Sequence, residues 1–246
     1  MVTKRETLLA QTFVDVADTL VADFDVLEFL TVLTSRCVEL FDLAEAGLLL
    51  GNGPGGVRVA ASSSHDARLL DVLEIQRDEG PSLDCFRAGA LVQCEDLRTA
   101  ADRWPRFVDQ AVASGWLSSY ALPMRLRDDT IGSLNLLRAQ TGLIDAADLV
   151  AAQALADVAT IGILQHRAAE EHRLLAEQLQ YALDSRVAIE QAKGVIGQHA
   201  DLSMDTAFSL LRGHARDHNL RLVDVAHALV DRSLDVESVA HKQRLK

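Results

Sequence analysis

Proline and cysteine are scarce in this chain, and their scarcity argues against several classes of protein. Only four of the 246 residues are proline, and none follows Pro123, so no proline ring interrupts a helix in the second half of the sequence. The three cysteines, Cys37, Cys85 and Cys94, are odd in number and have no metal-ligand spacing. Such a set favours a reducing compartment over a disulfide framework.

Long apolar runs and a secretory signal are also missing. The chain begins Met1-Val-Thr-Lys-Arg5 and passes directly into an amphipathic pattern, without the uninterrupted apolar core of a signal peptide. No uninterrupted apolar run approaches the roughly 18 residues that a membrane helix needs. We therefore expect a cytoplasmic protein that has no membrane partner.

Positive charge is in short supply. The formal net charge is -12, which argues against nonspecific nucleic-acid binding, because that binding depends on cations. From Arg186 to Lys246, however, nine Lys and Arg residues stand against eight Asp and Glu residues, so the acidic excess lies in the first 185 residues. A nearly neutral C-terminal end permits selective nucleic-acid binding but predicts weak nonspecific affinity.

The chain lacks the common catalytic and nucleotide-binding motifs. It has no phosphate-binding loop, no Gly-Xaa-Ser-Xaa-Gly sequence and no dinucleotide fingerprint. His214 and His218 have a spacing that suits a metal on a helix, but no third ligand follows nearby in the sequence. We expect no cofactor, no metal and no enzymatic activity.

The first 165 residues alternate between helical and strand patterns. Helical periodicity covers residues 5–22, and Asp25 caps a second helix that continues to Phe41. Five strand patterns follow, at residues 46–50, 57–61, 91–94, 118–122 and 131–137. Helices that begin at Ser64 and Trp104 are inserted between them. This order predicts an α+β domain, an antiparallel five-stranded sheet flanked by helices.

Residues 5–165 also resemble a GAF domain. The resemblance is carried by five motifs in order: Glu79-Gly-Pro81, Asp96-Leu97, Trp104-Pro105, Leu122-Pro123 and Ile131-Gly-Ser-Leu-Asn135. It implies a small-molecule sensor or dimerisation module, with a binding cavity over the sheet for an unknown ligand. Our candidate pocket residues are Cys85, Cys94 and Tyr120.

A very long helix is expected from Asp145 to about Gly197, because the helical pattern continues throughout. At 1.5 Å per residue it would be roughly 80 Å long, too long for one compact domain. Seven residues of its second half follow a heptad spacing: Leu175, Leu179, Ala182, Arg186, Ile189, Lys193 and Ile196. We therefore expect a coiled-coil linker at 166–184 and a homodimer, with dimer contacts at Leu175, Leu179, Ala182 and Ile189.

Two short helices follow, and neither is long enough to be stable alone. Ser203 caps the first, which carries Ala207 and Leu211, and the second runs from Leu222 to about Leu234. They would fold back on the end of the long helix as a three-helix bundle over residues 185–236. Gly194 is expected to allow close approach within this bundle, and residues 237–246 are expected to form a charged tail.

The bundle segment resembles the ANTAR domain, the RNA-binding output module of bacterial transcription antiterminators. The matching residues are Arg186, Ala192-Lys193-Gly194, Ala207, Leu211, Leu222 and Val225-Ala226. The resemblance implies an RNA target made of paired hairpins in leader transcripts that compete with a terminator. Our RNA-binding candidates are Arg186, Gln191, Lys193, Gly194, Ser203, Arg212, Arg216, Asn219 and Arg221. Of the two cations on the seam, we favour Lys193 over Arg186 for RNA.

Two alternatives remain open at this point. The nearly neutral tail also fits a sensor whose helical end binds a protein partner. The cysteines also fit a GAF-type redox enzyme, although buried cysteine is common in protein cores. If the chain is an antitermination regulator, a signal at the GAF domain would shift how the paired long helices pack and thereby present the RNA-binding ends differently.

Overall fold

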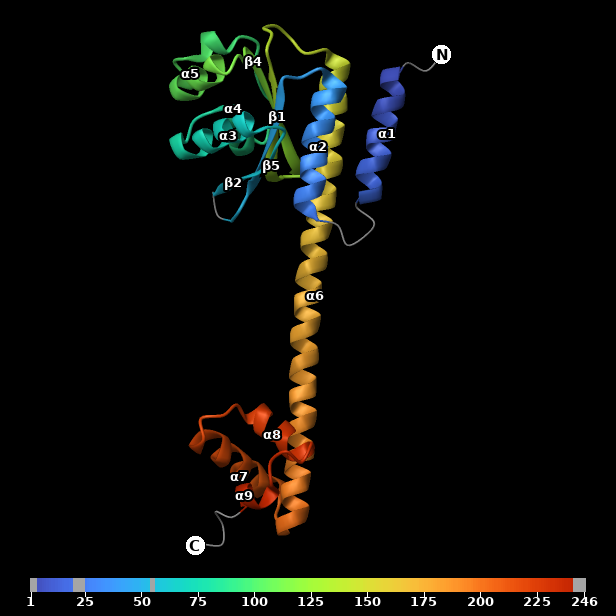
Figure 1. Cartoon of the computed structure of the whole chain (residues 1–246), viewed down its shortest axis with the longest axis vertical. Coiled ribbons are helices and arrows are strands. Elements are labelled where there is room, and N and C mark those ends of the chain that lie inside the picture. The colour runs from blue at the N-terminus through green and yellow to red at the C-terminus, as the bar shows by residue number, and fades with distance from the viewer. Residues whose placement is uncertain (1–3, 20–24, 54–55, 241–246) are drawn as a thin grey trace. The chain divides into compact units, whose positions relative to one another are not determined.

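The computed structural model describes residues 4–19, 25–53 and 56–240. The chain folds as two compact units, Met1–Arg167 and Ala168–Lys246 (Figure 1). One helix, α6 (Ala146–Ala200), contributes residues to both units. The expected N-terminal helix is α1 (Lys4–Thr19), and the predicted positions 20–22 of that helix lie outside the described residues.

The N-terminal unit is built on an antiparallel five-stranded sheet in the order β2-β1-β5-β4-β3. The strands are β1 (Glu45–Gly51), β2 (Val57–Ser62), β3 (Val92–Cys94), β4 (Ser118–Leu126) and β5 (Asp129–Arg138). Each lies where the alternating pattern predicted a strand, so the expected α+β fold is confirmed. The neighbouring strands β4 and β5 are joined by the tight hairpin at Arg127, whose φ of 58° is left-handed.

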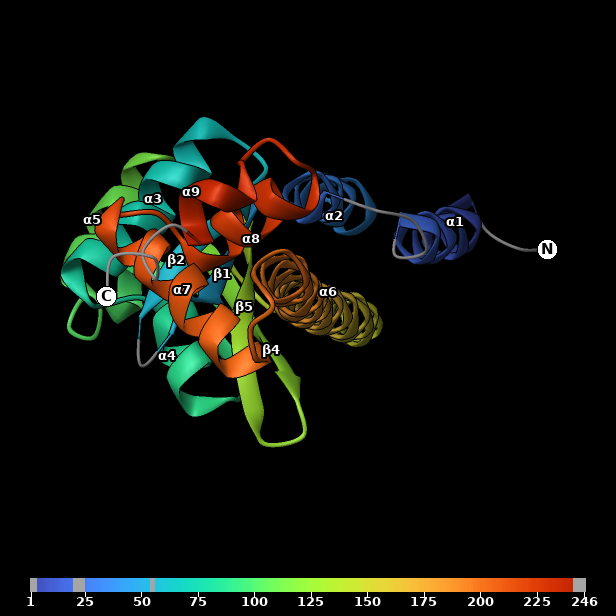
Figure 2. The ribbon, with the colours of Figure 1, turned by 90° about the horizontal axis from the view of Figure 1, so that it is seen from below.

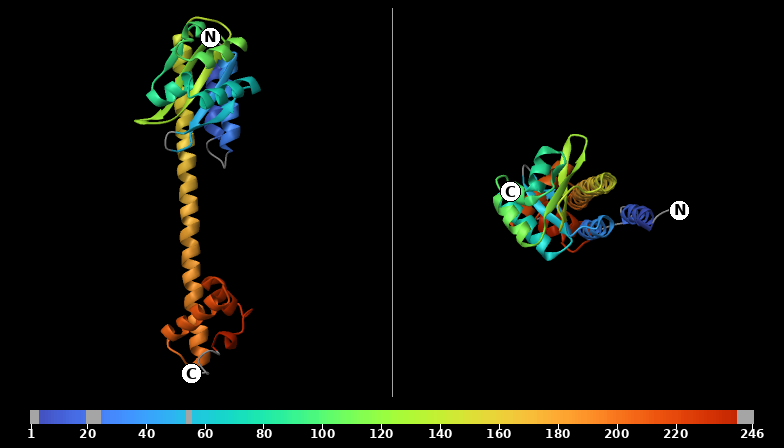
Figure 3. Two further views of the ribbon diagram at one scale, coloured as in Figure 1. Left: turned by 90° about the vertical axis from the view of Figure 1, so that its left-hand side faces the viewer. Right: turned by 90° about the horizontal axis from the view of Figure 1, so that it is seen from above.

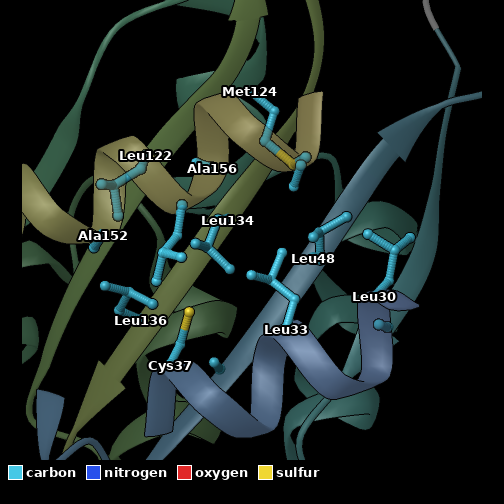
Figure 4. Packing of buried hydrophobic residues seen from close by; sticks show 14 of the residues in the cluster. Leu30, Leu33, Cys37, Leu48, Leu122, Met124, Leu134, Leu136, Ala152 and Ala156 are labelled. Carbon is cyan, nitrogen blue, oxygen red and sulfur yellow. The ribbon is translucent and has the colours of Figure 1, made fainter. Parts of the chain in front are cut away.

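Helices cover both faces of the sheet (Figure 2). Helix α2 (Val26–Phe41) and the first part of α6 cover one face, where Leu33, Leu134 and Ala156 belong to a single apolar core (Figure 4). Helices α3 (His65–Arg77), α4 (Pro81–Ala88) and α5 (Pro105–Ala113), with the 3-10 turn η1 (Leu97–Ala100), cover the other face. Both faces carry buried apolar residues, so both need a cover of helices.

Helix α6 is long and apolar enough, by length and composition alone, to cross a membrane. Its early apolar residues have another explanation, because Ala152, Leu155, Ala159 and Ile163 are buried in the core against the sheet. This helix is the one such candidate within the described part of the chain.

The connector between β5 and α6 is fixed by hydrogen bonds. The Tyr120 hydroxyl, on β4, donates to the carbonyl of Gly142 and accepts from the Ile144 backbone N–H at 3.1 Å. The Ser118 hydroxyl donates to the carbonyl of Gln140 at 2.7 Å, and the Gly142 N–H donates to the carbonyl of Glu95 at 2.9 Å. The start of α6 is therefore tied directly to the strands.

The C-terminal unit packs α7 (Met204–Asp217), α8 (Leu222–Val230) and α9 (Val236–Ala240) against the end of α6 (Figure 3). The expected bundle is present, with one difference. Residues 237–240, predicted to begin a charged tail, belong to α9, and Val239 is only 2% exposed in the bundle core. Val239 packs in the bundle core and so holds this segment against α7. Residues 241–246 of the tail lie outside the described residues.

Two neighbouring leucines on α3 test this account of the core. Leu70 is fully buried and Leu69 is 51% exposed. We expect Leu70→Ala to lower the free energy of unfolding by about 2–5 kcal/mol and Leu69→Ala to change it by less than about 0.5 kcal/mol. Both tryptophans, Trp104 and Trp116, are buried in the same unit, so their fluorescence during denaturant unfolding measures the effect. Equal effects of the two substitutions would contradict the assigned burial.

Candidate nucleic-acid interface

The end of α6 presents one face to the bundle. Ala188, Ala192 and Ile196 are buried against α7, α8 and α9, and Ile189 packs beside them. Leu175 and Leu179, by contrast, are 54% and 58% exposed. The residues of the predicted heptad seam therefore lie in two different environments. Its first residues remain on the surface, whereas Ile189 and Ile196 belong to the core of the bundle.

The expected role of Gly194 in close packing is wrong. A Cβ built at Gly194 meets no atom within 4 Å, so the bundle does not require glycine there. The close approach occurs at Gly197, where a Cβ would lie 3.2 Å from the carbonyl oxygen of Leu202 in the turn to α7. Helical spacing places Gly194 away from the buried positions Ala188, Ala192 and Ile196, which explains the open space.

Lys193 lies at the junction of α6 and α7. Its side chain is 15% exposed, and its Nζ donates to both carboxylate oxygens of Glu190 at 2.9 Å. The same nitrogen lies 5.8 Å from the centre of the Phe208 ring, within the range of a cation–π contact. An RNA phosphate would have to compete with Glu190 for this ammonium group.

Four cations line this side of the bundle. Phe208, Arg212 and Arg216 follow at four-residue intervals on α7 and thus share a face, and Lys193 lies beside Phe208. Arg186 is one heptad before Lys193 and is therefore on the same stripe of α6. We call Arg186, Lys193, Arg212 and Arg216 the basic face. Among the described residues Arg186 and Arg212 have no ion pair and are exposed, so both are accessible to phosphate.

The remaining RNA-binding candidates have local structural roles or lie elsewhere. Ser203 is the N-cap of α7, and its Oγ accepts from the Thr206 N–H at 3.3 Å. Asn219 has a left-handed φ of 54° just after α7, and Arg221 precedes α8 as its N-cap residue. Gln191 is exposed on α6, but its spacing from Lys193 places it off the basic face.

The two histidines stack on one another. The His214 and His218 rings lie 4.1 Å apart, and His218 Nδ1 is 2.9 Å from the carbonyl of His214. Within the described ranges, no group of three or more His, Cys, Asp and Glu side chains is placed to hold a metal ion. The pair closes the end of α7 as a stacked polar cap.

The three pocket candidates of the N-terminal unit do not lie together. Tyr120 belongs to the core beneath α2 and α6, whereas Cys85 and Cys94 belong to the layer under α3, α4 and α5. Burial raises the pKa of the Cys85 thiol to about 12 and also raises that of Cys94. Raised pKa values leave little thiolate, the reactive form, near neutral pH.

Sequence reasoning overlooked two acidic residues in this layer. Asp71 and Glu74 of α3 are 1% and 0% exposed. A signal was present, since residues 67, 70, 71 and 74 form one helix face and two of those four positions are acidic. Carboxylates on a core-facing stripe are uncommon unless paired.

The architecture is therefore that of a sensor-type α+β domain followed by a helical bundle with a basic face. A model of the GAF domain family matches residues 25–164, and a model of the ANTAR domain family matches residues 177–230. The chain belongs to the GAF domain family, and its GAF domain is followed by an ANTAR domain. A GAF sensor followed by an ANTAR RNA-binding domain is the arrangement of the antitermination regulator family. Both predicted resemblances are confirmed.

Solved structures support the fold of the first domain. The GAF domain of an Acinetobacter phosphoenolpyruvate-protein phosphotransferase has a TM-score of 0.53 at 13% identity, covering 70% of this chain and 99% of that one. The corresponding domain from Coxiella burnetii has a TM-score of 0.54 at 13% identity, covering 68% and 96%. Free methionine-R-sulfoxide reductase from Neisseria meningitidis, solved with its substrate, has a TM-score of 0.52 at 17% identity, covering 67% and 91%.

At these identities the similarity shows the fold alone. A comparison with curated protein sequences found no match.

The two glycines of α6 form a matched pair for testing the bundle. Gly194→Ala adds a methyl group in open space, so we expect it to stabilise the bundle by about 0.5–1 kcal/mol through helix propensity. Gly197→Ala crowds the carbonyl of Leu202 and should cancel that gain or destabilise the bundle. Circular dichroism during thermal unfolding measures both. A destabilised Gly194→Ala variant would show that the bundle does need glycine there.

Proposed function

We propose that this protein is a cytoplasmic, dimeric transcription antitermination regulator of bacterial type. Its ANTAR domain binds tandem RNA hairpins in leader transcripts and prevents a terminator from forming, and its GAF domain receives the controlling signal. The observation that carries the proposal is the coincidence of the ANTAR match with the basic face of the bundle. An RNA backbone requires such cations.

The shape of the basic face favours contacts to phosphate over stacking on bases. Phe208 is the one aromatic residue after Tyr181, and it lies beneath Lys193 rather than free on the surface. Sequence selectivity then has to come from polar side chains near the cations and from the shape of the hairpin. Asn219 follows Arg216 closely, because its N–H donates to the Arg216 carbonyl at 3.2 Å, so it is our candidate for a base contact.

Removing single cations tests this proposal. We expect Arg186→Ala, Arg212→Ala and Arg216→Ala each to weaken binding of a tandem-hairpin RNA about tenfold, the effect of losing one charge-assisted hydrogen bond of about 1.5 kcal/mol. Each should also reduce the slope of log affinity against log salt by about 1. Fluorescence anisotropy with labelled RNA at several salt concentrations measures both quantities.

The matched control is Arg173→Gln. Arg173 is an exposed cation of the same helix, paired with Glu170 and Glu177 outside the bundle, so its loss should leave RNA binding unchanged. Salt-independent association of the ANTAR domain with a protein, and none with RNA, would support a protein partner instead. Equal losses in Arg173→Gln and the three other variants would contradict a localised RNA site.

The dimer is proposed to form through the exposed apolar stripe on α6. Leu175, Leu179, Leu183 and Val187 follow at four-residue intervals and are each more than half exposed, and an apolar stripe of that kind favours a partner helix. The predicted contacts Leu175, Leu179 and Ala182 are on the surface. Ile189 already packs in the bundle, so we place the end of the dimer contact before it.

A charge placed on this stripe tests the dimer. We expect the wild-type chain to sediment with twice the mass of one chain and Leu179→Lys to sediment as a monomer, because a buried ammonium without a partner disfavours the paired state. The control is Leu126→Lys, a 44% exposed leucine in the hairpin of the sheet. Analytical ultracentrifugation distinguishes the outcomes, and a wild-type monomer at all concentrations would refute the dimer.

A further inference from the structure

The sheet face under α3 and α4 contains a cluster of buried polar side chains, which we call the polar centre. Its members are Asp71 and Glu74 of α3, Ser82 of α4, Ser62 of β2, and Ser133 and Asn135 of β5. Except for Ser62, each is at most 1% exposed. An apolar core would be the ordinary filling between a helix and a sheet, so this composition requires an explanation.

The fold leaves room for the two carboxyl groups. A Cβ at Gly47 of β1 would overlap the Asp71 carboxylate, and one at Gly80 would overlap the Glu74 side chain. In the sheet, Gly47 is the register partner of both Ser62 and Asn135. Asp71 thus lies over the position in β1 where Gly47 has no side chain, with Ser62 and Asn135 on either side of it.

Glu74 also holds the start of α4 in place. Its Oε1 accepts from the backbone N–H groups of Ser82 at 2.6 Å and Leu83 at 3.3 Å. Gly80, the N-cap residue of α4, has no side chain for this role. Asp71 is bonded in turn to β2, where its Oδ2 accepts from the Ser62 hydroxyl at 2.7 Å. The pair therefore links α3 to α4 and to the sheet.

No buried cation balances these two acids within the described residues. The titratable groups that interact with the pair are Arg68 of α3, which is exposed, and the Cys85 thiol of α4. The acidic groups of the surrounding segments have their own partners. Glu45 of β1 accepts from Ser63, Glu79 from the backbone of α5, and Asp84 of α4 from Arg103. β2 and β5 face the pair with uncharged Ser62, Ser133 and Asn135.

Hydrogen-bonding capacity also remains in the polar centre. Glu74 Oε2, Ser133 Oγ and Asn135 Nδ2 are buried without a hydrogen-bond partner. Buried polar atoms are rarely left unsatisfied, so such a group indicates a ligand, a water molecule or a change of state. Two ionised carboxylates in this space would be costly without a cation, and like charges at short range favour retention of a proton.

We propose that Asp71 and Glu74 form a buried proton-binding site that holds α4 on the sheet while the pair is protonated. Loss of both protons leaves two negative charges between α3 and the sheet, and no buried cation lies beside them to balance the charge. The packing of α4 on the sheet is then weakened. This inference goes beyond the proposed function and does not depend on RNA binding.

The direction of the pKa shifts agrees with the geometry. Burial raises the pKa of Asp71 to about 7, although Ser62 and Arg68 lower it. Burial and the charge of Asp71 raise the pKa of Glu74 to about 8, against the hydrogen bonds from Ser82 and Leu83. Because the folded state binds these protons more tightly than the unfolded chain, their contribution to stability is complete at acidic pH. It is lost as the pH rises through about 7 and about 8.

Denaturant unfolding of the full chain over a range of pH tests the proposal. Where the pair titrates, a difference of one bound proton changes the unfolding equilibrium constant about tenfold per pH unit. We expect the wild type to lose stability in this way between about pH 6 and about pH 8.5. The double variant Asp71→Asn, Glu74→Gln, which cannot ionise at these positions, should lose much less. Tryptophan fluorescence reports on this domain, because both tryptophans lie within it.

The matched control is Asp66→Asn, which removes an exposed carboxylate from the first turn of the same helix. It should keep the wild-type dependence on pH. Hydrogen exchange of the α4 amides beyond those bonded to Glu74 provides a local readout, since in the wild type the amides of residues 84–88 should lose protection above about pH 8 by more than the intrinsic rate change. An identical pH dependence of stability in the double variant and the wild type would overturn the proposal.

A measurement on the unaltered protein covers the case in which the double variant fails to fold. In a carbon-13 NMR titration of side-chain carboxyl groups, we expect two signals that titrate well above the ordinary range for Asp and Glu, which is about 4. Both signals should be absent or shifted in the single variants Asp71→Asn and Glu74→Gln. If every carboxyl group titrates below about pH 5, the pair holds no proton near neutral pH and the proposal fails.

Discussion

Both faces of the GAF-domain sheet carry buried apolar residues, and the need to cover both faces determines much of the structure. Helices α3, α4 and α5 cover one face, but α2 alone does not cover the other, where Ala152, Leu155 and Ile163 of α6 complete the core. The same helix supplies Ala188, Ala192 and Ile196 to the core of the ANTAR domain. Each domain is therefore incomplete without its own part of α6, which supplies one stretch to the core of each.

Periodicity predicted the fold well because burial determines periodicity. The strands, the long helix and the bundle lie where alternating or helical patterns placed them, and Ser64 and Ser203 cap the helices that they precede. The pattern was less informative where two surfaces use the same helix. Ile189 and Ile196 fit a heptad with Leu175 and Leu179, yet they pack in the bundle. Spacing alone does not reveal which neighbour a stripe meets.

The candidate sites were harder to predict, since they depend on contacts between segments far apart in the sequence. Arg212 and Arg216 share a face of α7 with Phe208, and Phe208, which appeared in the sequence merely as an isolated aromatic residue, contacts Lys193. Gly194 matched a family signature, but the bundle itself gives no packing reason for a glycine there. Asp71 and Glu74 have room only because Gly47, on a distant strand, and Gly80, before α4, lack side chains. Contacts of this kind exist only in the folded chain, so spacing along the sequence does not reveal them.

The connector between β5 and α6 has a mechanical consequence. Hydrogen bonds at Gln140, Gly142 and Ile144 fasten it to Ser118, Glu95 and Tyr120, so this stretch has no slack to absorb a displacement. A flexible linker would dissipate a movement of β4 as random motion of the chain. A shift of β4 that carried Tyr120 would here act directly on Gly142 and Ile144, just before α6, through their hydrogen bonds. The sheet and the start of α6 are therefore expected to move together rather than independently.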